Sequence, residues 1–303
     1  MKRFVFLTAC MGALLVLLFV IAFALIPVGR IGDVYPRVVT PRKQSLVIGT
    51  SRAAQAINPE ILNASLGDFY PPDLYNFAFH LDISSYNPYY VEAIRKKLQR
   101  PDDVRRYFIL AVDPWSFDDG VVSPPELALR SVSVRPNLEF IFRNFTRNWF
   151  TPFPTHSFVN DDGRTEVDYV PKSEQEWEAR VKARLVAYVE RSGNFCYSRS
   201  RESLLQLLID ELGARGDVYL VRIPVSAPML SLENSVCPDF SRRMRLVASW
   251  SGAVFFDFTD SPFGTTDGNH LVMSEGDRFS RQLADSIRFE CVRRRSVQGN
   301  IAE

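Results

Sequence analysis

The chain of 303 residues contains 46% hydrophobic and 23% charged residues, a composition that excludes a disordered chain, a coiled coil and a repeat array. Beyond a short N-terminal segment, this length leaves room for one large domain or two small ones. Lys and Arg number 36 against 35 Asp and Glu, so the net charge is only +1. Because a nucleic-acid-binding protein needs a positive surface to displace counterions, we exclude that class.

The N-terminus is apolar. Lys2 and Arg3 precede an uncharged run over residues 4–28. At about 1.5 Å per residue, a helix of this length spans a hydrocarbon core of roughly 30 Å. The positive charges before the run favour an N-in, C-out orientation.

We therefore expect residues 1–30 to be a single transmembrane anchor and residues 31–303 to form an extracytoplasmic domain on the periplasmic side of the membrane. The sequence Ala22-Phe23-Ala24 leaves open a cleaved secretory signal instead. Both interpretations place the domain outside the cytoplasm.

Beyond the N-terminus, short apolar runs alternate with amphipathic segments. The apolar runs predict strands over residues 46–49, 74–79, 107–112, 218–223 and 253–258. The amphipathic segments predict helices from residue 58 and over 89–100, 174–190, 200–213, 240–249 and 274–289. This alternation predicts an α/β fold, a flavodoxin-like three-layer sandwich whose parallel sheet has about five strands. Function is then expected at the carboxyl ends of the strands.

Residues 114–200 interrupt the alternation as an insertion into the domain. Aromatic residues and prolines are frequent over residues 138–159. A lid over the site, a membrane-proximal surface, a docking surface and a locally packed excursion remain open as interpretations.

The four cysteines show no pattern of metal ligands. Cys10 lies in the apolar N-terminal run, and Cys196, Cys237 and Cys291 lack the Cys/His spacing of a zinc site. Either one pair of the three forms a disulfide or all remain separate thiols. The acidic pairs of the sequence also lack further ligands, so we expect no metal.

A serine and a histidine far apart in the sequence are candidates for chemistry. Ser51 follows Gly49-Thr50 after the first expected strand, where a serine is often only a helix N-cap. His270 ends the sequence Asp267-Gly268-Asn269-His270 between the last expected strand and the last helix. Since loops after the first and last strands of a parallel sheet can open onto the same edge, the two side chains can meet. A carboxylate three residues before an imidazole can orient the ring toward a nucleophile.

These motifs, with Asn76, Leu271 and Gly276, resemble the SGNH (GDSL-type) hydrolase superfamily. The similarity is greatest to divergent membrane-anchored members such as the DltD-like and alginate O-acetylation proteins, and it covers residues 44–113 and 217–290. The resemblance implies Ser51 as nucleophile, His270 as general base and Asp267 as the residue that orients His270, without metal or organic cofactor.

The sequence departs from this superfamily in two places. The usual Gly-Asp-Ser is Gly49-Thr50-Ser51, and Val112-Asp113-Pro114-Trp115 stands where a Gly-x-Asn-Asp motif normally supplies an oxyanion-hole asparagine. We expect Asn76 to replace that asparagine, beside the backbone N–H of Ser51 or Arg52. The alternative for Asn76 is a turn residue that closes a strand.

The apolar N-terminus and this resemblance together imply an extracytoplasmic serine esterase or O-acyltransferase that acts on acyl groups of cell-envelope glycans through Ser51, His270 and Asp267. Its expected partners are the membrane, an acylated glycan and a membrane-bound O-acyltransferase. The alternative is a non-catalytic assembly scaffold that keeps the fold, motivated by the missing Gly-x-Asn-Asp and the long insertion.

Overall fold

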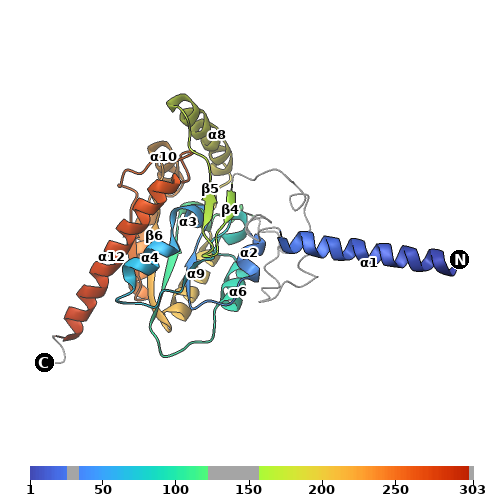
Figure 1. The fold of residues 1–303 in the computed structure, drawn as a ribbon. Helices are drawn as coiled ribbons and strands as arrows, with labels where there is room; N and C mark the ends of the chain where they lie inside the picture. The colour runs from blue at the N-terminus through green and yellow to red at the C-terminus, as the bar shows by residue number, and fades with distance from the viewer. Residues whose placement is uncertain (26–33, 122–156, 300–303) are drawn as a thin grey trace.

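The computed structural model describes residues 1–25, 34–121 and 157–299. The chain starts with helix α1 (Lys2–Leu25), which projects from the α/β body in Figure 1, followed by the short α2 (Val34–Val39). We expected a transmembrane segment over residues 4–28. Within the described part of the chain, none of the helices combines the length and apolar character that crossing a membrane requires.

The body is built on a five-stranded parallel sheet of order β2-β1-β3-β6-β7. The strands are β1 (Ser45–Ile48), β2 (Leu74–Asn76), β3 (Arg106–Ala111), β6 (Gly216–Arg222) and β7 (Val254–Asp257). Counted along the chain this order is 2-1-3-4-5, the flavodoxin-like arrangement. The predicted α/β class, the five strands and their parallel direction are confirmed.

One face of the sheet is covered by α3 (Ser51–Ala56), α4 (Pro59–Leu66) and the long α12 (Met273–Gly299) (Figure 1). The helix α12 directs Phe279, Leu283, Ile287 and Cys291 at four-residue spacing into the core. That spacing places four side chains on one helical face, opposite the odd-numbered residues of β3. The start of α12 packs on the end of α3, where Gly276 lies against Ala56 and the hydroxyl of Ser280 donates to the Ala56 carbonyl.

The other face is covered by α6 (Pro88–Lys97), α9 (Arg199–Gly213) and α11 (Phe240–Trp250). Their apolar residues pack on Leu46, Ile48, Phe108, Leu110 and Leu220, which alternate with the residues facing α12. Both faces of the sheet are therefore buried, as the continuous apolar runs of its strands predict.

Two helices that follow strands are not indicated by apolar periodicity in the sequence, namely α5 (Leu81–Ser84) and α10 (Ala227–Val236). The described part of residues 114–200 holds a 3-10 turn (Pro114–Phe117), an antiparallel hairpin of β4 (Ser157–Val159) and β5 (Thr165–Val167), and α8 (Glu174–Ser192). Most of the aromatic stretch at 138–159 lies outside the described residues. Helix α8 stands at the end of the body in Figure 1, beside α10.

All four cysteines are free thiols. Cys196 is exposed, whereas Cys237 and Cys291 are buried in different core clusters. Of the two alternatives that the sequence left open, the structure has separate thiols.

Candidate active site

A tight turn at the end of β1 sets the position of Ser51. Gly49 adopts φ +151°, and a Cβ on it would lie 2.8 Å from the Cβ of Ala111 on β3. Only glycine fits this backbone at that distance. The chain then enters α3 directly, with Thr50 as its N-cap and Ser51 as its first residue. Ser51 is thus not the cap residue, and its half-buried hydroxyl stands at the carboxyl edge of the sheet.

The loop that carries the histidine is held by its own aspartate. One carboxylate oxygen of Asp267 accepts the backbone N–H groups of Asn269 at 3.0 Å and of His270 at 2.9 Å. Gly268 between them has φ +82°, a conformation that favours glycine. A backbone hydrogen bond from Thr266 to the His270 carbonyl closes the loop. The Asp-Gly-Asn-His sequence therefore forms a turn that is held by its own hydrogen bonds and that orients the imidazole of His270.

The structure brings the three predicted side chains together. The Oγ of Ser51 lies 2.9 Å from Nε2 of His270, across 219 positions of sequence. On the other side of the ring, Nδ1 lies 3.0 Å and 3.2 Å from the two carboxylate oxygens of Asp267. Since a carboxylate only accepts, Nδ1 carries the ring proton and Nε2 is left to accept from the serine hydroxyl.

The electrostatics of the site keep the imidazole neutral and the carboxylate charged. Burial lowers the pKa of His270, and the cations of Arg184 and Arg52 add to this, while the bond to Asp267 opposes it. Burial alone would raise the pKa of Asp267. The hydrogen bond and charge of His270, with Arg184 and the Asn269 N–H, outweigh burial and hold that pKa well below its usual range. A neutral base beside a hydroxyl can take up its proton at neutral pH.

A residue that no sequence motif singles out also contacts Asp267. Arg184 on α8 places Nε and Nη2 at 2.8 Å and 2.6 Å from the same carboxylate oxygen that faces His270. The helix α8 is fixed nearby by Trp177, whose Nε1 donates to the hydroxyl of Thr265 at 3.3 Å. Part of the segment 114–200 is therefore tied to the loop of the candidate site.

We expect Arg184→Gln to raise the pKa of His270, because the Arg184 cation of the wild type opposes protonation of the nearby imidazole and the variant lacks it. The measurement is an NMR titration of the imidazole, assigned with His270→Gln. Lys182→Gln, on the exposed side of the same helix, is the control and leaves the titration unchanged. An unchanged His270 titration in Arg184→Gln contradicts the coupling.

The amide of Asn76 does not face the serine. Asn76 is fully buried, and its two amide protons are donated to the carbonyl oxygens of Ala53 and Ile57 at 2.9 Å and 3.0 Å. Its oxygen accepts the backbone N–H of Ala78. The expectation that Asn76 supplies an oxyanion donor is therefore wrong, because the last turn of α3 uses both of its protons. The strand-closing alternative describes it better.

Arg52 lies beside the site in a buried charge cluster. Its Nη1 is 2.6 Å from an oxygen of Glu233, whose other oxygen is 3.0 Å from Nη2 of Arg222. The Nε1 of Trp115 donates to Glu233 at 3.2 Å. The backbone N–H of Arg52, in the first turn of α3, has no acceptor among the described residues, which keeps it available as an oxyanion donor.

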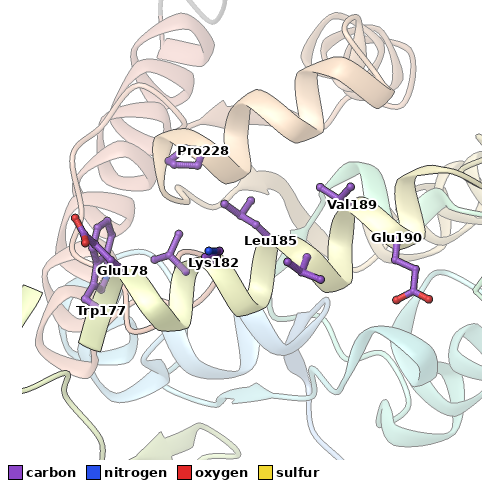
Figure 2. A pocket seen from close by; sticks show the side chains of 9 residues that line it. Trp177, Glu178, Lys182, Leu185, Val189, Glu190 and Pro228 are labelled. Atoms are coloured by element: carbon purple, nitrogen blue, oxygen red, sulfur yellow. The ribbon is translucent and has the colours of Figure 1, made fainter. Parts of the chain in front are cut away.

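Two surface grooves flank the loop of the site. The first, of about 730 Å³, runs between α8 and α10. Figure 2 shows Lys182, Leu185 and Val189 along α8, with Pro228 of α10 beyond them. A second groove of about 930 Å³ shares Trp177 and continues along residues 259–265. Neither lining includes Ser51 or His270, but Val181 of the first packs closely against Gly268.

The donor set of the site suits proton transfer. Over the described ranges, no group of three or more His, Cys, Asp or Glu side chains is arranged to hold a metal ion. The histidine nitrogens of the site face a carboxylate and a hydroxyl, which is the hydrogen-bond pattern of an activated nucleophile.

Comparison with known proteins finds structural similarity at low sequence identity. No family model matches the chain, and no curated protein sequence matches it. A carbohydrate acetylesterase from Sinorhizobium meliloti is similar with a TM-score of 0.43 and 11% identity, over 82% of this chain and 99% of that one. An aryl esterase from M. smegmatis is similar with a TM-score of 0.40 and 12% identity, over 81% of this chain and 98% of that one. A phospholipase A1 from Streptomyces albidoflavus is similar with a TM-score of 0.41 and 8% identity, over 81% of this chain and 99% of that one.

Proposed function

We propose that the chain is a serine ester hydrolase or acyltransferase, with Ser51 as nucleophile, His270 as general base and Asp267 as the group that orients the ring. The observation that carries this proposal is the continuous chain of contacts from the Ser51 hydroxyl through the imidazole to a buried carboxylate. The sequence resemblance to the SGNH superfamily supports the same assignment.

The geometry suggests how the acyl group is transferred. Nε2 of His270 takes the Ser51 proton as Oγ bonds to the acyl carbon, and the carbonyl electron pair moves to its oxygen. The tetrahedral intermediate collapses as the ester C–O bond breaks and the imidazolium protonates the leaving alcohol. Asp267 stabilises the imidazolium throughout. Water, or the hydroxyl of an acceptor, then attacks the seryl ester by the same proton route.

The substrate and the cellular setting are further parts of the proposal. The N-terminal positive charges and apolar run favour export, so we place the reaction outside the cytoplasm. The resemblance to envelope-modifying proteins favours O-acyl groups of cell-envelope glycans as substrate. If the seryl ester passes to a sugar hydroxyl, a membrane-bound O-acyltransferase is the partner that would supply its acyl group.

A fluorophosphonate probe tests the nucleophile directly. We expect one phosphonyl adduct per folded chain, located on the peptide of Ser51 by mass spectrometry and absent in Ser51→Ala. Ser203→Ala, an exposed serine on α9, labels like the wild type. Labelling of another serine, or none, would rule out the assignment. In cells with an intact cytoplasmic membrane, a membrane-impermeant probe must also reach Ser51 if the site is outside.

One observation favours a second candidate, a scaffold without turnover. Asn76, which the sequence predicts as an oxyanion donor, donates both amide protons to backbone carbonyl oxygens instead. A scaffold predicts that Ser51→Ala still complements a deletion strain, whereas the hydrolase predicts that it does not.

A further inference from the structure

The site contains an amide that is better placed than Asn76. The Nδ2 of Asn269 lies 3.3 Å from Nε2 of His270, the same atom that is 2.9 Å from the Ser51 hydroxyl. Asn269 is 2% exposed, so its amide protons are withheld from bulk solvent. An N–H group at this position stands beside the atoms where an acyl carbonyl would react.

The orientation of this amide is fixed by Arg52. Both Nε and Nη2 of Arg52 lie close to Oδ1 of Asn269, at 3.0 Å and 2.6 Å. A guanidinium only donates, so the amide oxygen must face Arg52 and the NH₂ group must face His270. The usual ambiguity between the two amide orientations is thereby removed.

The arginine is itself fixed from behind. Glu233 holds its Nη1 at 2.6 Å, and both side chains are almost completely buried. A planar guanidinium with an acid on one edge and an amide oxygen on the other cannot rotate without breaking one of them. Glu233, Arg52 and Asn269 thus form one rigid series of contacts that ends at Nε2 of His270, the atom that also contacts the Ser51 hydroxyl.

The proton transfer releases the Asn269 donor when it is needed. Before reaction Nε2 is an acceptor, shared by the Ser51 hydroxyl and the Asn269 amide. Once the Ser51 proton moves to Nε2, that nitrogen is a donor and no longer accepts. The Asn269 N–H then lacks an acceptor at the step in which the acyl oxygen becomes negative. A contact that strengthens only in the transition state accelerates the chemical step.

We propose that Asn269 donates its Nδ2 proton to the oxyanion formed on the Ser51-bound acyl group, and that Arg52 is the positioning residue that orients this amide. The inference rests on the proposed function. It assigns the role that the missing Gly-x-Asn-Asp asparagine leaves open, and it adds a side-chain donor to the backbone N–H of Arg52.

The test compares Asn269→Ala and Asn269→Asp with the wild type on 4-nitrophenyl acetate. The aspartate variant keeps an oxygen for Arg52 but loses the donor, so it separates donation from packing. We expect kcat to fall by about 10²–10³-fold in both variants, with KM nearly unchanged. Asn234→Ala, an exposed asparagine on α10, is the matched control and keeps wild-type kcat.

The role of Arg52 is tested by a double-variant cycle. Arg52→Lys keeps a cation for Glu233 but loses the two-pronged hold on Oδ1, so kcat falls in the wild-type background. In the Asn269→Ala background the same change costs nothing further, because the group that it orients is gone. Additive losses would contradict positioning through Asn269.

The two proposals fail in different ways. If Asn269→Ala and Asn269→Asp keep kcat within about threefold of the wild type while Ser51→Ala abolishes activity, the oxyanion assignment is wrong and the nucleophile stands. If Ser51→Ala keeps full activity, the proposed function is wrong. Residual activity in Asn269→Ala must also disappear when Ser51→Ala is added.

Discussion

Ser51→Ala is expected to lower kcat for a small acyl ester by about a millionfold, and adding His270→Ala to it is expected to cost nothing more. The two side chains work as one unit, because the seryl ester that His270 helps to form and to cleave cannot form without the Ser51 hydroxyl. With the hydroxyl gone, the 2.9 Å contact to Nε2 has no chemical consequence. Steady-state kinetics of both single variants and the double variant measure this directly.

The control for this cycle is Ser203→Ala, which keeps wild-type kcat because its exposed hydroxyl donates to the Arg199 carbonyl in the preceding turn of α9. Circular dichroism checks that each variant is folded. Independent, multiplicative losses from the two single variants would mean that serine and histidine act in separate steps, and the triad would have to be abandoned.

Glu233→Gln is expected to give the largest loss of stability, about 3–5 kcal/mol. Glu233 is completely buried and neutralises Arg52 and Arg222, which are each 3% exposed. Removing its charge leaves two buried guanidinium groups with less compensation. For a domain of this size, such a loss lowers the Tm by roughly 10 °C.

Differential scanning calorimetry of Glu233→Gln measures the loss. The control is Glu211→Gln, which removes a short ion pair to Arg95 whose side chains are both 43% exposed. Exposed pairs contribute about 0–1 kcal/mol, so this variant melts within a few degrees of the wild type. Equal melting temperatures for the two variants would show that the cluster is not needed for stability.

The order of strands and helices could be predicted from the sequence because β1, β2, β3 and nearly all of β6 are buried on both faces, whereas β7 is partly buried. The runs around Ile48, Ile109 and Leu220 are continuous and apolar, and they match β1, β3 and β6. The helix α10 was missed because only Met229 and Glu233 of its residues are buried, which leaves little periodicity to detect. The hairpin of β4 and β5 has three residues per strand and gives no clear alternation.

The candidate site was predictable where local sequence determines it. The turn before Ser51 requires a glycine, which the sequence shows as Gly49. The Asp267–His270 loop is held by hydrogen bonds among its own residues, so its sequence motif is local and recognisable. The amides were not predictable. The amide of Asn76 donates to carbonyl oxygens in the last turn of α3. The amide of Asn269 is oriented by Arg52, which is 217 positions away in the sequence. Such long-range contacts follow from packing and leave no local pattern.

Through the contact between Arg184 and Asp267, helix α8 belongs to the electrostatic environment of His270. A chain shortened to the sheet and its covering helices would keep Ser51, His270 and Asp267 but would hold a histidine of different basicity. Changes that displace α8 are therefore expected to alter the pKa of His270 while leaving Ser51, Asp267 and His270 themselves unchanged. For protein engineering, the working unit is the sheet together with α8.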